Sequence, residues 1–181
     1  GATINISTQG TSYLRYHSQS VSGATQDVQS ANVSLDFAKP TITDDFVLDG
    51  LWTNITQTVT LSPADNISGV EFVRHCSGAG CDVNTGTLLT NPYQISYTTD
   101  QETIVRYFAK DNASNPSLIG TYTVRLDITK PTTTTNYTLD ATWSNLNHSI
   151  NMSADCDISG CNYTRYWRDG TNTCSQVTDF T

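Results

Sequence analysis

The most frequent chemically distinctive pattern in the sequence is the sequon Asn-x-Ser/Thr, the acceptor of N-linked glycans in exported proteins. The 181-residue chain has 14 asparagines and 48 serines and threonines, so chance alone predicts about four sequons. Nine occur, at Asn5, Asn32, Asn54, Asn66, Asn112, Asn136, Asn147, Asn151 and Asn162. The excess predicts a heavily N-glycosylated extracellular protein, of archaeal or eukaryotic rather than bacterial type. The glycosylated asparagines should face solvent, with Asn66 and Asn112 foremost. The alternative explanation of the excess is that Asn, Ser and Thr co-occur because all three residue types are frequent in turns.

Four of the five cysteines form two pairs of equal spacing, Cys76 with Cys81 and Cys156 with Cys161. Four intervening residues that include glycine suit a disulfide that closes a hairpin, and such disulfides are typical of proteins that fold outside the cytosol. A zinc site of His75, Cys76 and Cys81 is the rival interpretation, but the sequence shows no fourth ligand. Cys174 is left over, either as a buried thiol or as a link to another chain.

Groups suited to catalysis are sparse. The sequence contains no nucleophile elbow, phosphate-binding loop or HExxH helix. The chain also repeats itself, as described below, and each of its three histidines, His17, His75 and His148, is replaced by another residue in the other copy. Carboxylates are plentiful but fall in expected turns and seams. The net charge of −8 argues against nucleic-acid binding, which needs a basic face to neutralise phosphate. We therefore expect neither an enzyme nor a nucleic-acid-binding protein.

The elements that position these groups are short strands. Charged residues make up only 14% of the chain, and short apolar runs alternate with clusters of Gly, Pro, Asn and Asp. Strands are expected over residues 41–48, 54–61, 70–75, 87–89, 93–97, 103–109 and 118–128. Seven short strands in about 90 residues predict a two-sheet immunoglobulin-like sandwich. No run of 18 apolar residues occurs, so no membrane span is expected in this segment.

The sequence repeats itself after 91 residues. Residues 126–143, LDITKPTTTTNYTLDATW, match residues 35–52, LDFAKPTITDDFVLDGLW, at nine positions, and the match continues on both sides. Residues 36–126 are therefore expected to form a complete domain. Residues 127–181 align with the first half of such a domain and residues 1–35 with its second half. The predicted fold class is all-β: tandem immunoglobulin-like sandwiches of about 91 residues, one complete and two complementary halves.

The two halves predict an assembly. Residues 127–181 alone would leave an apolar face and an open sheet edge, which folded proteins avoid. Residues 1–35 carry the missing strands, expected at residues 2–7, 13–18 and 32–37. We expect residues 1–35 of one copy to complete residues 127–181 of a neighbouring copy, head to tail. Either strands of one subunit complete the next subunit, or the 181 residues are one repeat unit of a longer continuous chain. The second interpretation is preferred, because Phe180-Thr181 runs naturally into Gly1-Ala2-Thr3-Ile4.

A family resemblance rests on motifs in the order Trp52, Val59-x-Leu61, Ala64-Asp65-x-x-Ser68-Gly69-Val70, Tyr107-x-Ala109-x-Asp111-x-Ala113-x-Asn115 and Leu126-Asp127-x-Thr129-x-Pro131. This order resembles the tandem immunoglobulin-like repeats of bacterial and archaeal cell-surface proteins, over nearly the whole chain. Two local departures are Ser114, where glycine is usual, and Ser18-Gln19-Ser20, where Ala109-Lys110-Asp111 would stand. The resemblance implies a spacer in a stalk, an adhesin or a cell-surface layer.

Three aspartates are candidates for a calcium site. In a sandwich of this strand order, the loops of Asp65 and Asp111 lie at the end where the preceding linker carries Asp36. A calcium ion held there would stiffen the joint between domains. The alternative is that these carboxylates bond their own backbone, as aspartates in turns do. Calcium is the one cofactor candidate.

Exposed aromatic side chains would suit carbohydrate binding, and three aromatic residues gather in one segment: Tyr163, Tyr166 and Trp167. Tyr163 and Trp167 share a strand face, as core residues would. Core packing is therefore the favoured interpretation for them, and for Trp52 and Trp143.

These observations predict a structural subunit or repeat unit of an extracellular, glycosylated surface filament or stalk. Its expected partners are other copies of itself and N-linked glycans. The alternative, from a different functional class, is an adhesin or glycan-binding module.

Overall fold

The computed structural model describes residues 3–138, 142–166 and 178–180, the last three by their backbone alone. The described chain is almost entirely β-structure, as the sequence predicts. Its contacts divide it into two compact units. One unit comprises Gly1–Phe46, Val59–Ile95 and Ile104–Tyr122, and the other comprises Val47–Thr58, Ser96–Thr103 and Thr123–Thr181.

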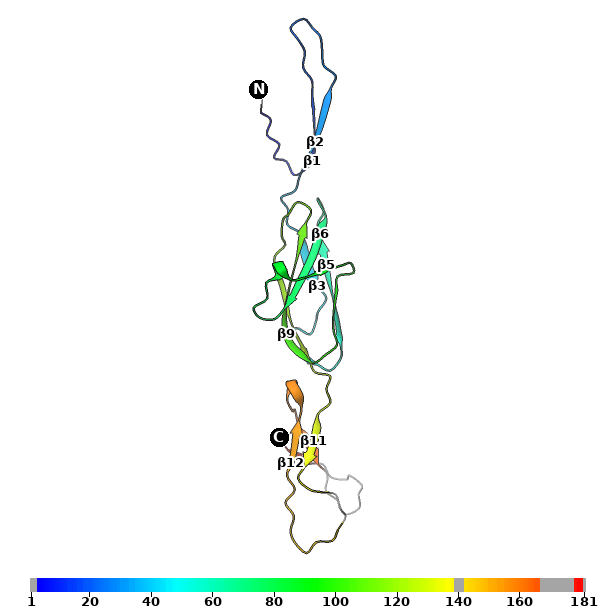
Figure 1. Cartoon of the computed structure of the whole chain (residues 1–181), viewed down its shortest axis with the longest axis vertical. Coiled ribbons are helices and arrows are strands. Elements are labelled where there is room, and N and C mark those ends of the chain that lie inside the picture. The colour runs from blue at the N-terminus through cyan, green and yellow to red at the C-terminus, as the bar shows by residue number, and fades with distance from the viewer. Residues whose placement is uncertain (1–2, 139–141, 167–177, 181) are drawn as a thin grey trace. The chain divides into compact units, whose positions relative to one another are not determined.

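The central domain is a two-sheet sandwich (Figure 1). One sheet has the order β3-β5-β8: β3 (Thr41–Asp44), β5 (Gln57–Ala64) and β8 (Gln94–Tyr97). The other has the order β4-β10-β9-β6-β7: β4 (Trp52–Thr53), β6 (Val70–Ser77), β7 (Thr87–Leu89), β9 (Gln101–Asp111) and β10 (Gly120–Leu126). Strand β4 pairs with β10 in parallel, whereas β6 pairs antiparallel with both β7 and β9. This division of strands confirms the predicted immunoglobulin-like sandwich.

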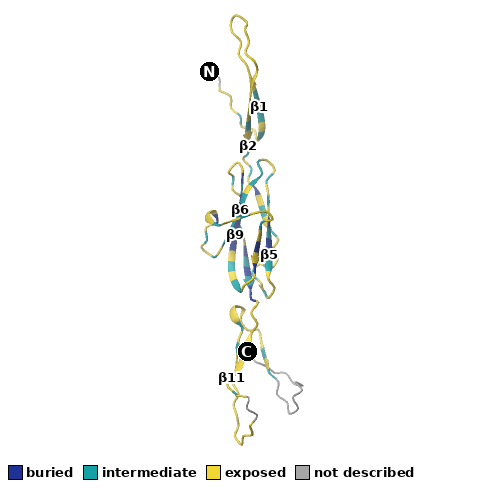
Figure 2. Ribbon diagram, turned by 45° about the vertical axis from the view of Figure 1, so that its right-hand side comes forward, coloured by how far each residue is buried: buried dark blue, intermediate teal, exposed yellow. Residues whose placement is uncertain are grey.

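The core follows from the period-two alternation of strand side chains. Both sheets contribute residues that are less than 5% exposed, among them Val59, Leu61, Val73, Val105, Tyr107, Tyr122, Val124 and Leu126. Figure 2 shows this buried material along β5, β6 and β9, whereas β11 is mostly exposed. Full burial of one such side chain stabilises the fold by roughly 1.5–3 kcal/mol. The sandwich therefore has a core of its own.

The flanking segments form isolated hairpins. β1 (Gly10–Tyr16) pairs with β2 (Gln29–Leu35), β11 (Thr132–Thr135) with β12 (Met152–Asp155), and β13 (Thr164–Tyr166) with β14 (Thr178–Phe180). Within the described residues, each of these strands has its hairpin partner as its one neighbour. The described helices are two single 3₁₀ turns, Val83–Thr85 and Asp157–Ser159. No helix among the described residues has the length and apolarity to cross a membrane.

The C-terminal hairpins reproduce the strand register of the central domain at an offset of 91 residues. Thr132 pairs with Asp155 as Thr41 pairs with Ala64. In the same way, Thr164 pairs with Phe180 as Val73 pairs with Leu89. Adding 91 to each residue of β3–β5 and β6–β7 gives the corresponding flanking pair. The repeat read from the sequence is therefore also a repeat of backbone geometry.

The N-terminal hairpin reproduces the β9–β10 hairpin at the same offset. β1 and β2 start at Gly10 and Gln29, 91 residues before Gln101 and Gly120, where β9 and β10 start. The connecting turns also match, since the isolated bridge between Gln19 and Thr25 repeats that between Lys110 and Pro116. The N–H of Ser20 donates to the Ala24 carbonyl at 2.8 Å, as Asp111 does to Asn115 at 3.1 Å.

Several expected strand limits are wrong. The strand expected over residues 41–48 ends at Asp44, because the Asp44 carboxylate accepts the Phe46 N–H at 3.0 Å and turns the chain. Residues 57–64 form β5 instead of residues 54–61, since β3 pairs with β5 as far as Ala64. Residues 3–7, expected as part of a strand, form none. Their counterpart β8 is a strand because it pairs with β5, and residues 3–7 have no such neighbour in the described chain.

Candidate functional site

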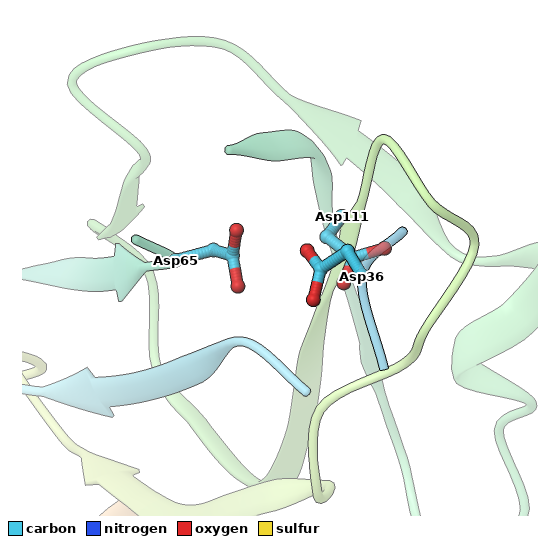
Figure 3. Close-up of side chains that lie close together, drawn as sticks. All are labelled: Asp36, Asp65 and Asp111. Carbon is cyan, nitrogen blue, oxygen red and sulfur yellow. The ribbon is translucent and has the colours of Figure 1, made fainter. Parts of the chain in front are cut away.

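Three aspartates converge where the chain enters the sandwich (Figure 3). Asp36 follows β2, Asp65 follows β5 and Asp111 ends β9. Carboxylate oxygens of all three lie within 4.8 Å of one another. Asp111 is fully buried, and Asp36 and Asp65 are half-buried. The structure thus brings together the three candidates that the sequence placed at one end of the sandwich.

Two of these carboxylates organise their own loops. Asp111 Oδ1 accepts the N–H groups of Ala113 at 2.9 Å and Asn115 at 2.8 Å, and its Oδ2 accepts the Asn115 side-chain amide at 2.9 Å. Asp65 Oδ1 accepts the N–H groups of Ile67 at 3.1 Å and Gly69 at 2.7 Å. Several N–H donors on one carboxylate offset the cost of burying its charge.

Asp36 connects the linker to the sandwich. Its Oδ1 accepts the Ala38 N–H at 2.9 Å and its Oδ2 accepts the Ser68 N–H at 3.0 Å, while the Asn115 amide donates to the Asp36 carbonyl at 3.1 Å. The Ser68 side chain and these two N–H groups lower the pKa of Asp36 below its usual 3.8, against a smaller opposing effect of burial. The Ser68 hydroxyl makes no hydrogen bond of ordinary geometry. The hydrogen bonds that hold the Asp36 carboxylate are therefore those from the Ala38 and Ser68 N–H groups. We call this arrangement the Asp36 clasp.

A second aspartate cluster repeats the clasp in the other unit. Carboxylate oxygens of Asp100, Asp127 and Asp157 lie within 4.8 Å of one another. Asp127 stands 91 residues after Asp36, and its Oδ2 accepts the Ser159 N–H at 3.1 Å as Asp36 accepts that of Ser68. Its Oδ1 accepts the Thr129 N–H at 3.2 Å, the counterpart of the Ala38 contact. Asp127 is 8% exposed, so its charge is also buried and hydrogen-bonded.

Asp100 adds a contact that the first cluster lacks. It accepts the hydroxyl of Thr129 and the N–H of Ile128, so it is bonded to the linker that follows Asp127. The Thr129 hydroxyl is the largest cause that lowers the pKa of Asp100. Sequence analysis missed this cluster. Asp127 was detectable as the repeat of Asp36, but Gln9 stands at the Asp100 position of the N-terminal copy, so the repeat gave no signal for Asp100.

The chemistry of the clusters is that of oxygen ligands and hydrogen-bond acceptors. Carboxylates are ligands that calcium prefers, and either trio could supply part of a coordination shell. The hydrogen bonds already account for the convergence of the carboxylates, because they accept N–H groups of the loops that they join. Calcium binding at Asp36, Asp65 and Asp111 stays a prediction, checked by comparing the melting temperature in calcium and in chelator.

All nine sequon asparagines are exposed, as glycan attachment requires. Asn112 differs from the expectation in one respect. Its side-chain nitrogen, the atom that would carry the glycan, donates to the carbonyls of Ser68 at 2.8 Å and Gly69 at 3.2 Å. No such contact engages the amide nitrogen of Asn66 in the described structure. Of the two asparagines placed foremost, Asn66 is the more open acceptor.

Both disulfides are present in the structure, with Cα–Cα distances of 5.9 Å for Cys76–Cys81 and 5.1 Å for Cys156–Cys161. The zinc alternative fails, because the two sulfur atoms that would bind the metal are bonded to each other. His75 is half-buried, its Nδ1 makes no hydrogen bond, and desolvation lowers its pKa. Cys174 lies outside the described residues.

The expectation of core packing for the aromatic residues is wrong where the structure describes them. Trp143 is fully exposed, Tyr163 is 53% exposed and Trp52 is 37% exposed. The Arg165 guanidinium lies 4.3 Å from the centre of the Tyr163 ring, and Arg125 lies 6.0 Å from that of Trp52. Trp167 lies outside the described residues.

Comparisons with known proteins add little to this geometry. The chain matches none of the protein-family profiles, and no curated protein matches its sequence. Among solved structures it is similar to the fibronectin(III)-like modules of Clostridium thermocellum CbhA, with 14% sequence identity and a TM-score of 0.39. The match covers 68% of this chain, and the chain spans 65% of that structure's length. A similarity of this size assigns no function.

Proposed function

We propose that this chain is a structural module of an extracellular, glycosylated surface filament or stalk, in which copies join head to tail. The observation that carries the proposal is the 91-residue repeat of strand register. In support, the C-terminal flank has strand pairs and aspartate contacts at the offset of those in the central domain, and the N-terminal flank has the corresponding turn. In the described residues of each flank, fewer strands are present than in the central sandwich.

The strands that each flank lacks are those that the other carries. By the 91-residue offset, residues 3–35 align with β8, β9 and β10, and the aligned segments of β9 and β10 form the strands β1 and β2. Residues 127–180 align with β3 to β7, and the segments aligned with β3, β5, β6 and β7 contain the strands β11, β12, β13 and β14. In the central sandwich, these two groups meet where β8 lies beside β5, β9 beside β6 and β10 beside β4. Joining the first group of one copy to the second group of another would make a complete sandwich at every junction.

Two features support an extracellular location. The described chain contains two disulfides, which persist in oxidising compartments. All nine sequon asparagines are exposed, although the side-chain nitrogen of Asn112 donates to two backbone carbonyls. Glycans would also keep the surface of an assembled filament hydrated.

Assembly is tested by purifying the full chain and following its size with concentration, by light scattering and by electron microscopy. We expect species that grow with concentration into filaments, because a heterologous contact that does not close propagates. A chain that stays a dispersed monomer over this range would overturn the proposal. The location is tested by the mass of the native protein before and after deglycosylation, which should fall. An unchanged mass would remove the glycoprotein part.

A glycan-binding module is the second candidate, and the exposure of Trp143 and Tyr163 favours it. Aromatic rings that lie open to solvent can stack on sugar rings. Glycan-array binding by the wild-type chain, and its loss in Tyr163→Ser, would support this function. Equal binding by both proteins would contradict a role for Tyr163.

A further inference from the structure

We infer that a second copy of this chain docks the end of its β1 strand and the two residues that follow it, residues 16–18, against β13, in the register that β9 and β6 have in the central sandwich. This inference rests on the proposed head-to-tail assembly and specifies its interface. The central sandwich supplies the template, because its counterparts to both docking strands are present, paired and described. The occupant is a second copy because β1 is the repeat counterpart of β9, which pairs with β6, while β13, the counterpart of β6, has β14 as its one neighbour among the described residues.

The register follows from three pairs of the β6–β9 ladder. Val73 lies opposite Ala109, Arg74 opposite Phe108 and His75 opposite Tyr107. Adding 91 to the β6 residue and subtracting 91 from the β9 residue gives the pairs between copies. These pairs are Thr164 with Ser18, Arg165 with His17 and Tyr166 with Tyr16 of the second copy.

The second strand of the docking hairpin has a site as well. In the central domain, Trp52 pairs in parallel with Arg125. The same shift places Trp143 beside Ser34 of the second copy. Trp143 belongs to no strand in a single copy. Its counterpart Trp52 lies in a strand whose partner is β10, and the counterpart of β10 is β2 of the docking hairpin.

Apolar exposure on both flanks agrees with this interface. Ile95, Tyr107 and Val59 are 8%, 4% and 1% exposed in the central sandwich. Their counterparts Ile4, Tyr16 and Ile150 are 62%, 51% and 52% exposed. Docking would cover Ile4 and Tyr16 of one copy and Ile150 of the other. Apolar side chains at positions that are buried in the complete copy favour an apolar contact over a solvated surface.

Two positions show where the docked hairpin must differ from the template. A Cβ atom at Gly120 would lie 2.1 Å from the Tyr107 ring, and Gln29 stands at this position in the N-terminal copy. The carboxylate that Tyr107 contacts, Asp44, is replaced by Thr135. Tyr16 therefore takes a ring position different from that of Tyr107. The backbone register of the docked hairpin does not depend on where this side chain packs.

The register is tested by disulfide trapping between two differently tagged full-length chains, each carrying one introduced cysteine and Cys174→Ser. The matched mixtures are Thr164→Cys with Ser18→Cys, and Arg165→Cys with His17→Cys. Two successive pairs are used because antiparallel pairs alternate between wider and closer Cα separations, about 5.5 and 4.5 Å. The control mixture is Thr164→Cys with Gln19→Cys. In the docked strand the side chain of Gln19 would point to the face opposite that of Ser18, because their counterparts Lys110 and Ala109 are successive residues of β9.

We expect oxidation to give the mixed covalent dimer from at least one matched mixture and none from the control. Filaments that form without trapping at either matched pair, or with trapping in the control, would overturn the register and leave the proposed function standing. Chains that remain monomers would overturn both.

A single chain with both Ser18→Cys and Thr164→Cys separates open from closed assembly. A ladder of covalent multimers supports the head-to-tail register. A product that stops at the dimer supports the register but overturns the filament.

Discussion

The buried contact between Tyr107 and Asp44 tests how the complete sandwich is stabilised. The Tyr107 hydroxyl donates to Asp44 Oδ2, Tyr107 is 4% exposed, and the other carboxylate oxygen accepts the Phe46 N–H at 3.0 Å. Tyr107→Phe keeps the ring and removes one of these two donors. A hydrogen bond to a charged group contributes about 1.5–3 kcal/mol. Because Asp44 is half-buried and water replaces part of the contact, we expect the free energy of unfolding at pH 7 to fall by about 1.5–2 kcal/mol.

The same contact has a pH signature. Burial, and then the hydrogen bond to Asp44, raise the pKa of Tyr107 above its usual 10.0. The unfolded chain therefore loses the Tyr107 proton at a lower pH than the folded chain does. The contribution of Tyr107 is fully present below pH 10 and is lost as pH rises further, by about 1.4 kcal/mol per pH unit. The stability difference between wild type and Tyr107→Phe should therefore shrink between pH 9 and pH 11.

The assay is urea unfolding followed by circular dichroism, at pH 7, pH 9 and pH 11. Tyr16→Phe is the matched control, because Tyr16 is the repeat counterpart of Tyr107 but is 51% exposed. The control should change stability by less than about 0.5 kcal/mol. A Tyr107→Phe protein as stable as the control at pH 7 would refute the reasoning.

Three further changes test other contacts, each by unfolding in urea. Gly120→Ala should destabilise the fold by about 1–3 kcal/mol, because the new Cβ would lie 2.1 Å from Tyr107; unchanged stability would contradict this close approach. The double variant Cys76→Ser, Cys81→Ser should lose about 2 kcal/mol, since the disulfide closes only a short loop, and free thiols in the native protein would contradict the pairing. Asp36→Asn should be less stable than wild type at pH 7 but not in acid. The folded-state pKa of Asp36 is lowered, so its contribution is present above its usual 3.8 and is lost as pH falls through the lowered pKa; an equal difference at both pH values would contradict this.

The internal repeat predicted much of the architecture because strand register is carried by the positions of apolar residues and turns. The match of Thr41 with Thr132 predicted equivalent strands, and both strands have the same partners at the 91-residue offset. The strand propensities of the residues predicted the ends of the strands less accurately than the repeat predicted their pairing. Asp44 ends β3 through a side-chain contact that an apolar pattern does not show.

The part of the candidate site that could be predicted from the sequence is the part whose contacts all lie within the central sandwich and its entry linker. Asp36, Asp65 and Asp111 follow from loop positions in a fold that the sequence predicts. Asp100 was missed, because its contact is with the linker that leaves the domain. Trp143 was predicted to pack in a core because tryptophan is a large apolar residue. Burial depends on a neighbouring strand, and no such strand lies beside Trp143 in the described chain.

The Asp36 clasp also determines how the linker would respond to tension. A pull on the segment before β3 reaches Asp36 first. There, the carboxylate is bonded to the Ser68 N–H, and the carbonyl accepts the Asn115 amide. The force would therefore spread into the two loops that follow β5 and β9 before it reached the β3 edge of the sheet. Asp127 and Ser159 repeat the first of these bonds at the next linker, where Asp100 also accepts the Ile128 N–H and the Thr129 hydroxyl. Release of that linker would therefore break the bonds to both carboxylates.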